Sequence, residues 1–198
     1  VACNTATAEA IATIRSTLDI PIIGVEPGIK PAAMQSQNGI VGVLATEATL
    51  NSDKFNALLA TLPEHCQFIK QAGAGLVPLI EAGLIETPEM QALLRSHLKP
   101  ILDQGADTLV LGCTHYPFLK KMIRAVVGDS MTLIDTSDAV VRQLLRQIHQ
   151  QGLIVSSKHS PKLSLLSTAN ADTLEAMAER LLHRDLSKYA IYTKTLTL

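Results

Sequence analysis

The sequence is poor in aromatic residues and has no long hydrophobic run. Its 198 residues include no tryptophan, three tyrosines and three phenylalanines. The core must therefore consist of Ile, Leu, Val and Ala side chains, a composition typical of helices packed on parallel strands. No apolar run approaches the roughly 20 residues that a membrane span needs, and no signal peptide is visible.

An excess of charge of one sign is also missing. The 17 Lys and Arg residues oppose 18 Asp and Glu residues, for a formal net charge of −1. Without a basic field, nucleic-acid binding is not expected, because a phosphate backbone would find no electrostatic partner. Hydrophobic residues make up 47% of the chain and charged residues 18%, which indicates a well-buried globular protein and not a disordered one.

Cysteine is scarce, with Cys3, Cys66 and Cys113 only. An odd number without CxxC spacing argues against a disulfide framework and against a zinc site. Reduced thiols in a cytoplasmic protein are the simplest interpretation. Cys66 has no polar neighbours of interest and is expected to be structural.

Short apolar runs alternate with helical periodicity, which predicts an α/β protein. Strands are expected at residues 1–3, 21–25, 39–45, 67–70, 108–111, 131–134 and 163–166, and a loop at 46–50. Helices are expected after Asn4, at 30–37, after Ser52, at 87–104, after Pro117, from the cap at 135–137 to 150, and at 172–183. Residues 189–198 are ambiguous. We expect two packed lobes, each a mainly parallel sheet flanked by helices.

Two turns repeat one layout. In both VACNTA and LGCTHY, Cys3 and Cys113 end an apolar strand and are followed by small polar residues and then a helix. Ligands bind outside the carboxyl ends of the strands in open α/β sheets, where the following helices also point their amino termini. The two turns therefore predict one ligand site, although ordinary turn chemistry would explain either turn alone.

The residue types suggest the chemistry. A helix amino terminus should lower the pKa of each thiol, and free backbone N–H groups with nearby hydroxyls can hold a carboxylate. Two facing thiols would supply one acid/base group on each face of an amino acid, as racemisation requires. Covalent catalysis by Cys113 with His115 is a weaker alternative.

The motifs resemble those of the glutamate racemases of the aspartate/glutamate racemase family. Besides CNTA and GCTHYP, the resemblance includes GVEPGIKPA, GVLATEATLNS and LVPLIEAG, and it runs through about Ala139. It implies cofactor-independent conversion of L-glutamate to D-glutamate in the cytoplasm, supplying D-glutamate for peptidoglycan synthesis, with no metal. It also implies a first lobe of residues 1–25 and 137–198 and a second lobe of residues 26–136.

The resemblance also assigns roles to individual residues. Cys3 and Cys113 would be the catalytic acid/base pair, with Glu81 and His115 assisting Cys113. The substrate-binding residues would be Asn4, Thr5, Thr46, Thr49, Thr114 and His115. From the pattern alone, Glu81 could simply face solvent, and Thr46 and Thr49 could equally cap a helix. His65, His97, His149, His159 and His183 are expected at the surface.

The chain starts at Val1, just before the first cysteine motif. The resemblance implies a preceding segment with an Asp-Ser-Gly-type motif and a Tyr-Gly pair; a protein that truly began at Val1 should lose much of its activity and stability. The resemblance implies glutamate, a peptidoglycan-precursor activator and a second copy in a homodimer as partners. It implies no membrane and no nucleic acid. The alternatives are an aspartate racemase, or a truncated non-catalytic chain that binds a protein such as DNA gyrase.

Overall fold

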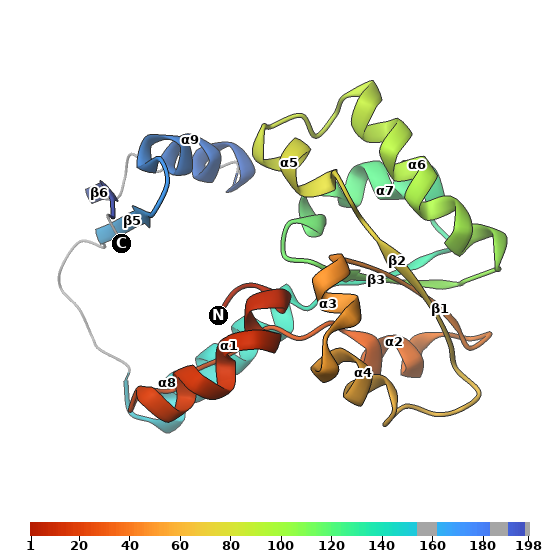
Figure 1. Ribbon diagram of the computed structural model, residues 1–198, viewed down its shortest axis with the longest axis horizontal. Helices are drawn as coiled ribbons and strands as arrows, with labels where there is room; N and C mark the ends of the chain where they lie inside the picture. The colour runs from red at the N-terminus through yellow and green to blue at the C-terminus, as the bar shows by residue number, and fades with distance from the viewer. Residues whose placement is uncertain (154–161, 183–189, 197–198) are drawn as a thin grey trace. The chain divides into compact units, whose positions relative to one another are not determined.

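The computed structural model describes residues 1–153, 162–182 and 190–196, which belong to two compact units, Val1–Gly152 and Leu153–Leu198. The first unit contains a parallel sheet of strand order β2-β1-β3-β4 with helices on both faces (Figure 1). Its strands are β1 Ile40–Ala45, β2 Gln67–Ala72, β3 Thr108–Gly112 and β4 Thr132–Ile134. Its helices are α1 Asn4–Thr17, α2 Ile29–Gln35, α3 Glu47–Asn51, α4 Asp53–Leu59, α5 Leu76–Glu81, α6 Pro88–Asp103, a 3-10 helix Tyr116–Leu119, α7 Lys120–Val127 and α8 Ser137–Gln150.

The two central strands, β1 and β3, are buried along nearly their whole length. On one face of the sheet, side chains of α2 and α4 pack against the strands in an aliphatic cluster that contains one aromatic ring. Its members include Ile29, Ala32, Val41, Val43, Phe55 and Val110. Helices α6 and α7 cover the other face with fully buried side chains such as Leu98 and Ile123. Burial on both faces is what an all-parallel sheet requires.

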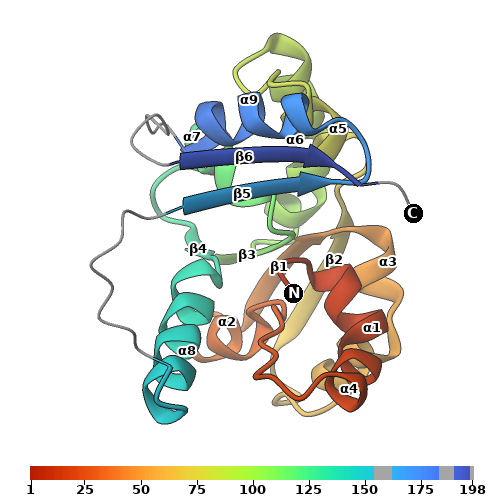
Figure 2. The ribbon, with the colours of Figure 1, turned by 90° about the vertical axis from the view of Figure 1, so that its left-hand side faces the viewer.

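The second unit pairs β5, Lys162–Ser167, in parallel with β6, Ala190–Thr195. Helix α9, Ala171–Leu182, lies along one face of the two strands (Figure 2). The expected strand at 163–166 and helix at 172–183 are confirmed, except that His183 lies outside the described residues. The ambiguous closing segment contains β6, and Tyr189, Thr197 and Leu198 also lie outside the described residues.

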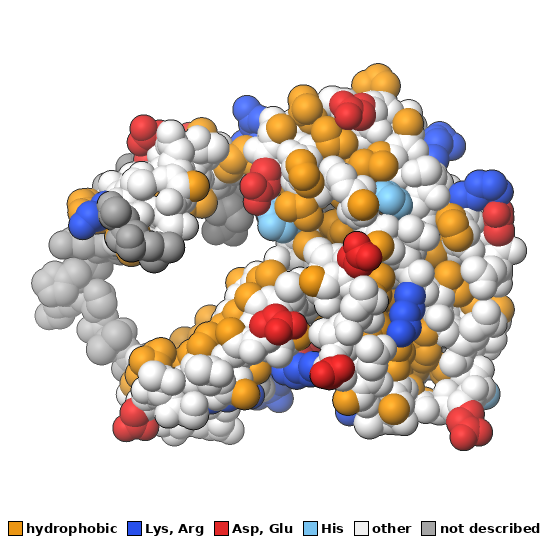
Figure 3. Space-filling view, viewed as in Figure 1, with side chains coloured by type: hydrophobic (Ala, Val, Ile, Leu, Met, Phe, Trp, Pro, Cys, Tyr) orange, Lys and Arg blue, Asp and Glu red, His pale blue; other side chains and the backbone are white. Residues whose placement is uncertain are grey.

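The α/β class and the parallel sheets flanked by helices are therefore confirmed. The division into lobes of residues 1–25 with 137–198 and of residues 26–136 stays a prediction. Helix α8 forms where expected, but none of its residues is buried. Its Val141, Leu144 and Leu145 are exposed, and Figure 3 shows hydrophobic side chains over this part of the surface.

Three local expectations were wrong. Residues 1–3 and 21–25 form no strand, because a strand needs a hydrogen-bonded ladder and the hydrogen bonds of these residues are isolated. The amino group of Val1 donates to the Ile23 carbonyl (2.6 Å), and the Val25 N–H donates to the Thr7 hydroxyl (3.2 Å). The expected loop at 46–50 is mostly helix α3, begun by Thr46, whose hydroxyl accepts from the Thr49 N–H at 3.2 Å.

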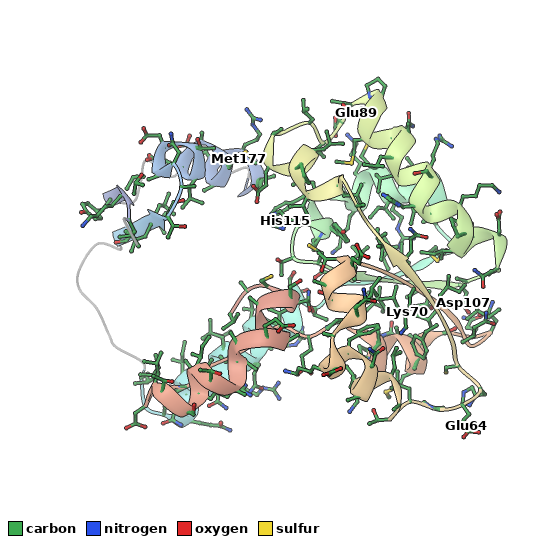
Figure 4. All side chains as sticks on the ribbon, viewed as in Figure 1. Glu64, Lys70, Glu89, Asp107, His115 and Met177 are labelled. Carbon is green, nitrogen blue, oxygen red and sulfur yellow. The ribbon has the colours of Figure 1, made fainter. Side chains whose placement is uncertain are left out.

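The amino ends of β1 and β3 are joined by Asp107. Its carboxylate accepts hydrogen bonds from the Ser36 hydroxyl (2.6 Å), the Gln37 N–H (2.7 Å), the Asn38 N–H (2.9 Å) and the Thr108 hydroxyl (2.9 Å). Burial alone would raise the pKa of Asp107, but these hydrogen bonds outweigh it and hold the pKa below its ordinary value. Figure 4 shows Asp107 at the end of the sheet remote from His115.

Asp107→Asn should lower the free energy of unfolding at neutral pH by about 1–3 kcal/mol, because hydrogen bonds to a charged acceptor are lost. A carboxyl whose pKa is lowered in the folded state stabilises the protein above its unfolded-state pKa, and this contribution is lost as the pH falls through the folded-state value. The difference between wild type and variant should therefore shrink below about pH 4 in urea denaturation. Asp103→Asn, at an exposed position, is the control and should change little; a pH-independent difference for Asp107→Asn would contradict the assignment.

Candidate active site

The two cysteine turns lie at the carboxyl end of the sheet and in contact with each other. Cys3 is the N-cap of α1, and its sulfur accepts from the Ala6 N–H at 3.5 Å. Cys113 directly follows β3. The Thr114 hydroxyl donates to the Ala2 carbonyl at 3.0 Å, which joins the two turns over 112 residues of sequence. The two turns are therefore in contact, and their forming one ligand site stays a prediction.

The environment of Cys113 differs from the sequence expectation. Its side chain is 8% exposed, and burial raises the pKa of the Cys113 thiol; the N–H groups of His115 and Tyr116 oppose this, and a charge on Cys3 adds to it. The expectation of a lowered pKa was wrong because Cys113 is followed by a 3-10 helix, with α7 starting only at Lys120. Desolvation therefore outweighs the few oriented N–H groups.

Cys113, His115 and Glu81 form a connected row. The Cys113 sulfur lies 3.8 Å from His115 Nδ1, and His115 Nε2 lies 3.0 Å from Glu81 Oε1. Since a carboxylate only accepts, Nε2 carries the hydrogen, and Nδ1 is left to exchange a proton with the sulfur. His115 is 32% and Glu81 65% exposed, so the row leads from a buried thiol to solvent. Figure 4 shows His115 beside α5, the helix that ends in Glu81.

Thr5, Thr46 and Thr49 form a triangle of hydroxyls next to the Cys3 turn. The Thr5 oxygen lies 2.9 Å from the Thr46 oxygen and 2.9 Å from the Thr49 oxygen, and Thr46 and Thr49 are 2.8 Å apart. Thr49 is only 1% exposed. Thr46 thus does cap a helix, as one of the two interpretations held, but it also orients Thr5, which follows Asn4 in the first cysteine turn.

Thr49→Val removes one hydroxyl of the triangle with almost no change of shape. If the triangle fixes the hydroxyl of Thr5 for ligand binding, KM for the substrate of this site should rise by about tenfold, the effect of one hydrogen bond. Steady-state kinetics with that substrate measure this. Thr17→Val, at an exposed position on α1, is the matched control and should leave KM unchanged. An unchanged KM in Thr49→Val would limit the triangle to a structural role.

A cavity of about 250 Å³ adjoins Cys113 and is also lined by Asn4, Thr114, Asp135 and Ser137. Asn4 is 5% exposed, and its Oδ1 is the one buried side-chain oxygen or nitrogen without a hydrogen-bond partner among the described residues. Such an atom is costly unless a ligand or another group satisfies it.

Asp135 was missed by the sequence analysis. It follows β4 and therefore lies at the same carboxyl edge as Cys113, so the rule applied to the cysteine turns would have found it. Its carboxylate accepts from Lys120 (2.6 Å) and from the Ser137 N–H (2.7 Å). Burial would raise the pKa of Asp135, but these hydrogen bonds and the charge of Lys120 outweigh it and lower the pKa.

The remaining predicted positions lie apart from this site. Cys66 is half-buried, with its sulfur 4.0 Å from the Ala33 carbonyl. His65 and His149 are exposed as expected, and His97 is partly exposed, with its Nε2 2.8 Å from the Ala74 carbonyl. His159 and His183 lie outside the described residues.

The described residues include neither a metal-binding group nor a membrane-spanning helix. Over residues 1–153, 162–182 and 190–196, no group of three or more His, Cys, Asp and Glu side chains could hold a metal ion. None of the helices in that part of the chain is both long and apolar enough to cross a membrane.

The chain is similar to glutamate racemases of known sequence. It is 53% identical over 183 residues to the glutamate racemase of Cupriavidus pinatubonensis, covering 92% of this chain and 67% of the relative. It is 52% identical over 183 residues to that of Ralstonia nicotianae, covering 92% and 65%. The chain thus spans about two thirds of the length of these curated relatives.

Solved structures of glutamate racemases are also similar to this chain. Glutamate racemase isoform RacE1 from Bacillus anthracis superimposes with a TM-score of 0.82 at 29% identity, covering 99% of this chain and 73% of that one. The Escherichia coli glutamate racemase, solved with L-glutamate and the activator UDP-MurNAc-ala, gives 0.81 at 31% identity, covering 96% and 71%.

The family model described as Asp/Glu/Hydantoin racemase matches residues 1–144, a stretch that includes both cysteine turns, the row from Cys113 to Glu81 and the hydroxyl triangle. The chain therefore belongs to the Asp/Glu/Hydantoin racemase family.

Proposed function

We propose that the protein carrying this chain interconverts L-glutamate and D-glutamate without a cofactor, by proton transfer at Cα between Cys3 and Cys113. The observation that carries the proposal is the contact between the two cysteine turns, with Cys113 linked to His115 and Glu81. One turn alone would supply acid/base chemistry on one face of a substrate. Two turns in contact are proposed to supply it on both faces.

In the proposed reaction, the thiolate of one cysteine takes the Cα proton, so that the C–H bond breaks and an S–H bond forms. The electron pair left on Cα is delocalised into the α-carboxylate. The thiol of the other cysteine then gives its proton to the opposite face of Cα, which forms the enantiomer and leaves a new thiolate. Both directions use the same groups in exchanged roles.

The weak acidity of the Cα–H bond is the main obstacle to this reaction. Hydrogen-bond donors fixed around the carboxylate must stabilise the charge that develops there. Asn4, Thr5, Thr114 and His115 are the proposed donors, because they flank the two cysteines. The hydroxyl triangle supports this role, since Thr46 and Thr49 hold the Thr5 oxygen in place before a ligand arrives.

Each turnover exchanges the protonation states of the two sulfurs. Return to the starting state requires a route for protons between Cys113 and water. His115 and the largely exposed Glu81 are proposed to provide it, since they connect the buried sulfur to solvent through contacts of 3.8 Å and 3.0 Å. The raised pKa of Cys113 favours the thiol, which suits Cys113 to act as the acid in one direction.

The similarity to glutamate racemases supports a proposal about the biological setting. We propose that the product supplies D-glutamate for peptidoglycan synthesis in the cytoplasm, and that a peptidoglycan precursor activates the enzyme, as UDP-MurNAc-ala does for the Escherichia coli relative. Titration of the precursor into the racemase assay tests the activator. The homodimer stays a prediction.

Aspartate racemisation and a non-catalytic protein-binding role are less favoured. The similar curated proteins, including the two at 53% and 52% identity, are named glutamate racemase. Assaying glutamate and aspartate in parallel decides the substrate. A preparation that turns over neither amino acid but retains a specific protein from a pull-down would favour the binding role.

The proposal is tested with the complete protein that contains this sequence, in deuterated water. Pure L-glutamate and pure D-glutamate should each lose their circular dichroism signal and converge on an equal mixture, because the enantiomers have equal free energy. Mass spectrometry should find deuterium in the newly formed enantiomer, since the proton on the second sulfur comes from solvent. A stable signal from both isomers would reject the proposal.

A further inference from the structure

The turn that precedes α5 is held from two sides. This turn, Gly73, Ala74 and Gly75, joins β2 to the helix that ends in Glu81. The carbonyl of Gly73 accepts from the Tyr116 hydroxyl at 3.3 Å, and the carbonyl of Ala74 lies 2.8 Å from His97 Nε2. Since a carbonyl only accepts, His97 donates through Nε2, and its Nδ1 is the acceptor for the Gln71 amide at 3.3 Å.

Helix α5 has little of its own to fix its position. It is six residues long, and its N-cap, Gly75, provides no side-chain hydrogen bond. Its buried side chains, Leu76 and Ile80, anchor one face, while Glu81 is on the exposed side. The entry turn, together with these two side chains, therefore determines where the helix ends, and so where the Glu81 carboxylate lies relative to His115.

Tyr116 connects this turn to the proposed catalytic row. It is the residue after His115, and it is fully buried. Burial raises the pKa of its hydroxyl, with a further contribution from Cys113, so that the hydroxyl remains a donor. The contact is close: a Cβ atom on Gly73 would lie 2.3 Å from the Tyr116 oxygen, so only glycine fits there. The segment that carries His115 therefore also contacts the turn that leads to Glu81. The contact is the hydrogen bond between Tyr116 and Gly73, which are 43 residues apart in the sequence.

We propose that Tyr116 and His97 are positioning residues that hold α5 so that Glu81 stays within hydrogen-bond distance of His115. Neither side chain is assigned to substrate contact or to proton transfer. The catalytic meaning of the inference rests on the proposed function, but the geometric claim does not. The test must therefore report on the contacts among Glu81, His115 and Cys113 without depending on racemase activity.

The alkylation rate of Cys113 by iodoacetamide at a fixed pH is such a readout, with the modified peptide identified by mass spectrometry. Loss of the Glu81 carboxylate makes the His115 imidazolium less favourable, which leaves less Cys113 thiolate to react. Glu81→Gln and Tyr116→Phe should therefore each slow alkylation. Their double variant should be no slower than Glu81→Gln alone, because both changes remove the same interaction.

A merely structural role of Tyr116 would give additive effects in this double-mutant cycle, and additivity would overturn the proposal. So would an alkylation rate in Tyr116→Phe equal to that of wild type. Tyr192→Phe, at an exposed position, is the matched control and should behave as wild type. Circular dichroism melts check that each variant is folded.

His97 gives a second, independent pair of variants. His97→Gln keeps an N–H donor for the Ala74 carbonyl and should retain the wild-type alkylation rate, whereas His97→Leu should lower it. His149→Leu, exposed on α8, is the control. Equal rates in His97→Gln and His97→Leu would remove His97 from the proposal.

In the racemase assay, Tyr116→Phe should lower kcat by about tenfold, the effect of one lost hydrogen bond, with KM unchanged. If wild type does not racemise glutamate, the proposed function fails, while the alkylation cycle still supports or overturns the positioning claim. If wild type is active and the cycle is additive, the positioning claim fails alone.

Discussion

Replacing Cys113 by serine should lower kcat/KM for glutamate racemisation by at least about a thousandfold, within the range that a positioned acid/base group contributes. A serine hydroxyl is a far weaker acid than a thiol, so it cannot form the anion that takes the Cα proton. The row through His115 and Glu81 would remain in place, because the change replaces a sulfur by an oxygen at a position that is 8% exposed. Polarimetry from pure L-glutamate and from pure D-glutamate measures the loss.

Cys3→Ser should be equally damaging, since racemisation needs both faces of Cα. Cys66→Ser is the matched control, because Cys66 is half-buried just before β2 and its sulfur lies 4.0 Å from the Ala33 carbonyl. Near-normal activity in Cys113→Ser, with the variant folded, would rule out a two-thiol mechanism and would shift attention to other bases such as Asp135.

Leu109→Ala should lower the free energy of unfolding by about 3 kcal/mol, the usual cost of a large-to-small change in a core. Leu109 is fully buried at the second position of β3, between β1 and β4, where it pairs with Gly42 and Leu133. The flanking strands β1 and β4 are held by the hydrogen bonds of the sheet and cannot move inward to fill the space, so a cavity should remain. Urea denaturation followed by circular dichroism measures the change.

Met34→Ala is the control for this change. Met34 belongs to α2 but is 86% exposed, so its truncation should alter the free energy of unfolding by no more than about 0.5 kcal/mol. A comparable cost for both variants would mean that β3 is not at the centre of the core.

Most of the sheet and its helices could be predicted from local patterns. Helix α6 begins as expected, with the Thr87 hydroxyl accepting from the Met90 N–H (3.2 Å) and Pro88 in the first turn. Strands β1 and β3 are apolar runs bounded by turn residues, and their burial on both faces follows from their composition.

The secondary-structure expectations that were wrong have a common physical cause. The conformation of these segments depends on residues that are distant in the sequence. Residues 21–25 have strand composition, yet a strand exists only where another strand supplies its hydrogen bonds. The Thr46-Glu47 start of α3 was readable as a cap but was interpreted as a loop, because the helix is only five residues long. Sequence periodicity cannot resolve elements this short.

For the candidate site too, features set by local sequence could be predicted, and features set by distant residues could not. The carboxyl-end rule found both cysteine turns, and Thr114 does join them. The pKa of Cys113 was predicted in the wrong direction because sequence indicates a helix terminus but not burial. The contacts of Tyr116 with Gly73 and of Glu81 with His115 span 43 and 34 residues, and no local pattern encodes such separations.

A crystal structure of the complete protein with glutamate bound would show whether the two sulfurs serve one substrate carbon. We expect Cα between Cys3 and Cys113, with the sulfurs on opposite faces and each near the contact distance of roughly 3–3.5 Å that proton transfer requires. A glutamate bound productively with only one of these sulfurs within reach of Cα would contradict it.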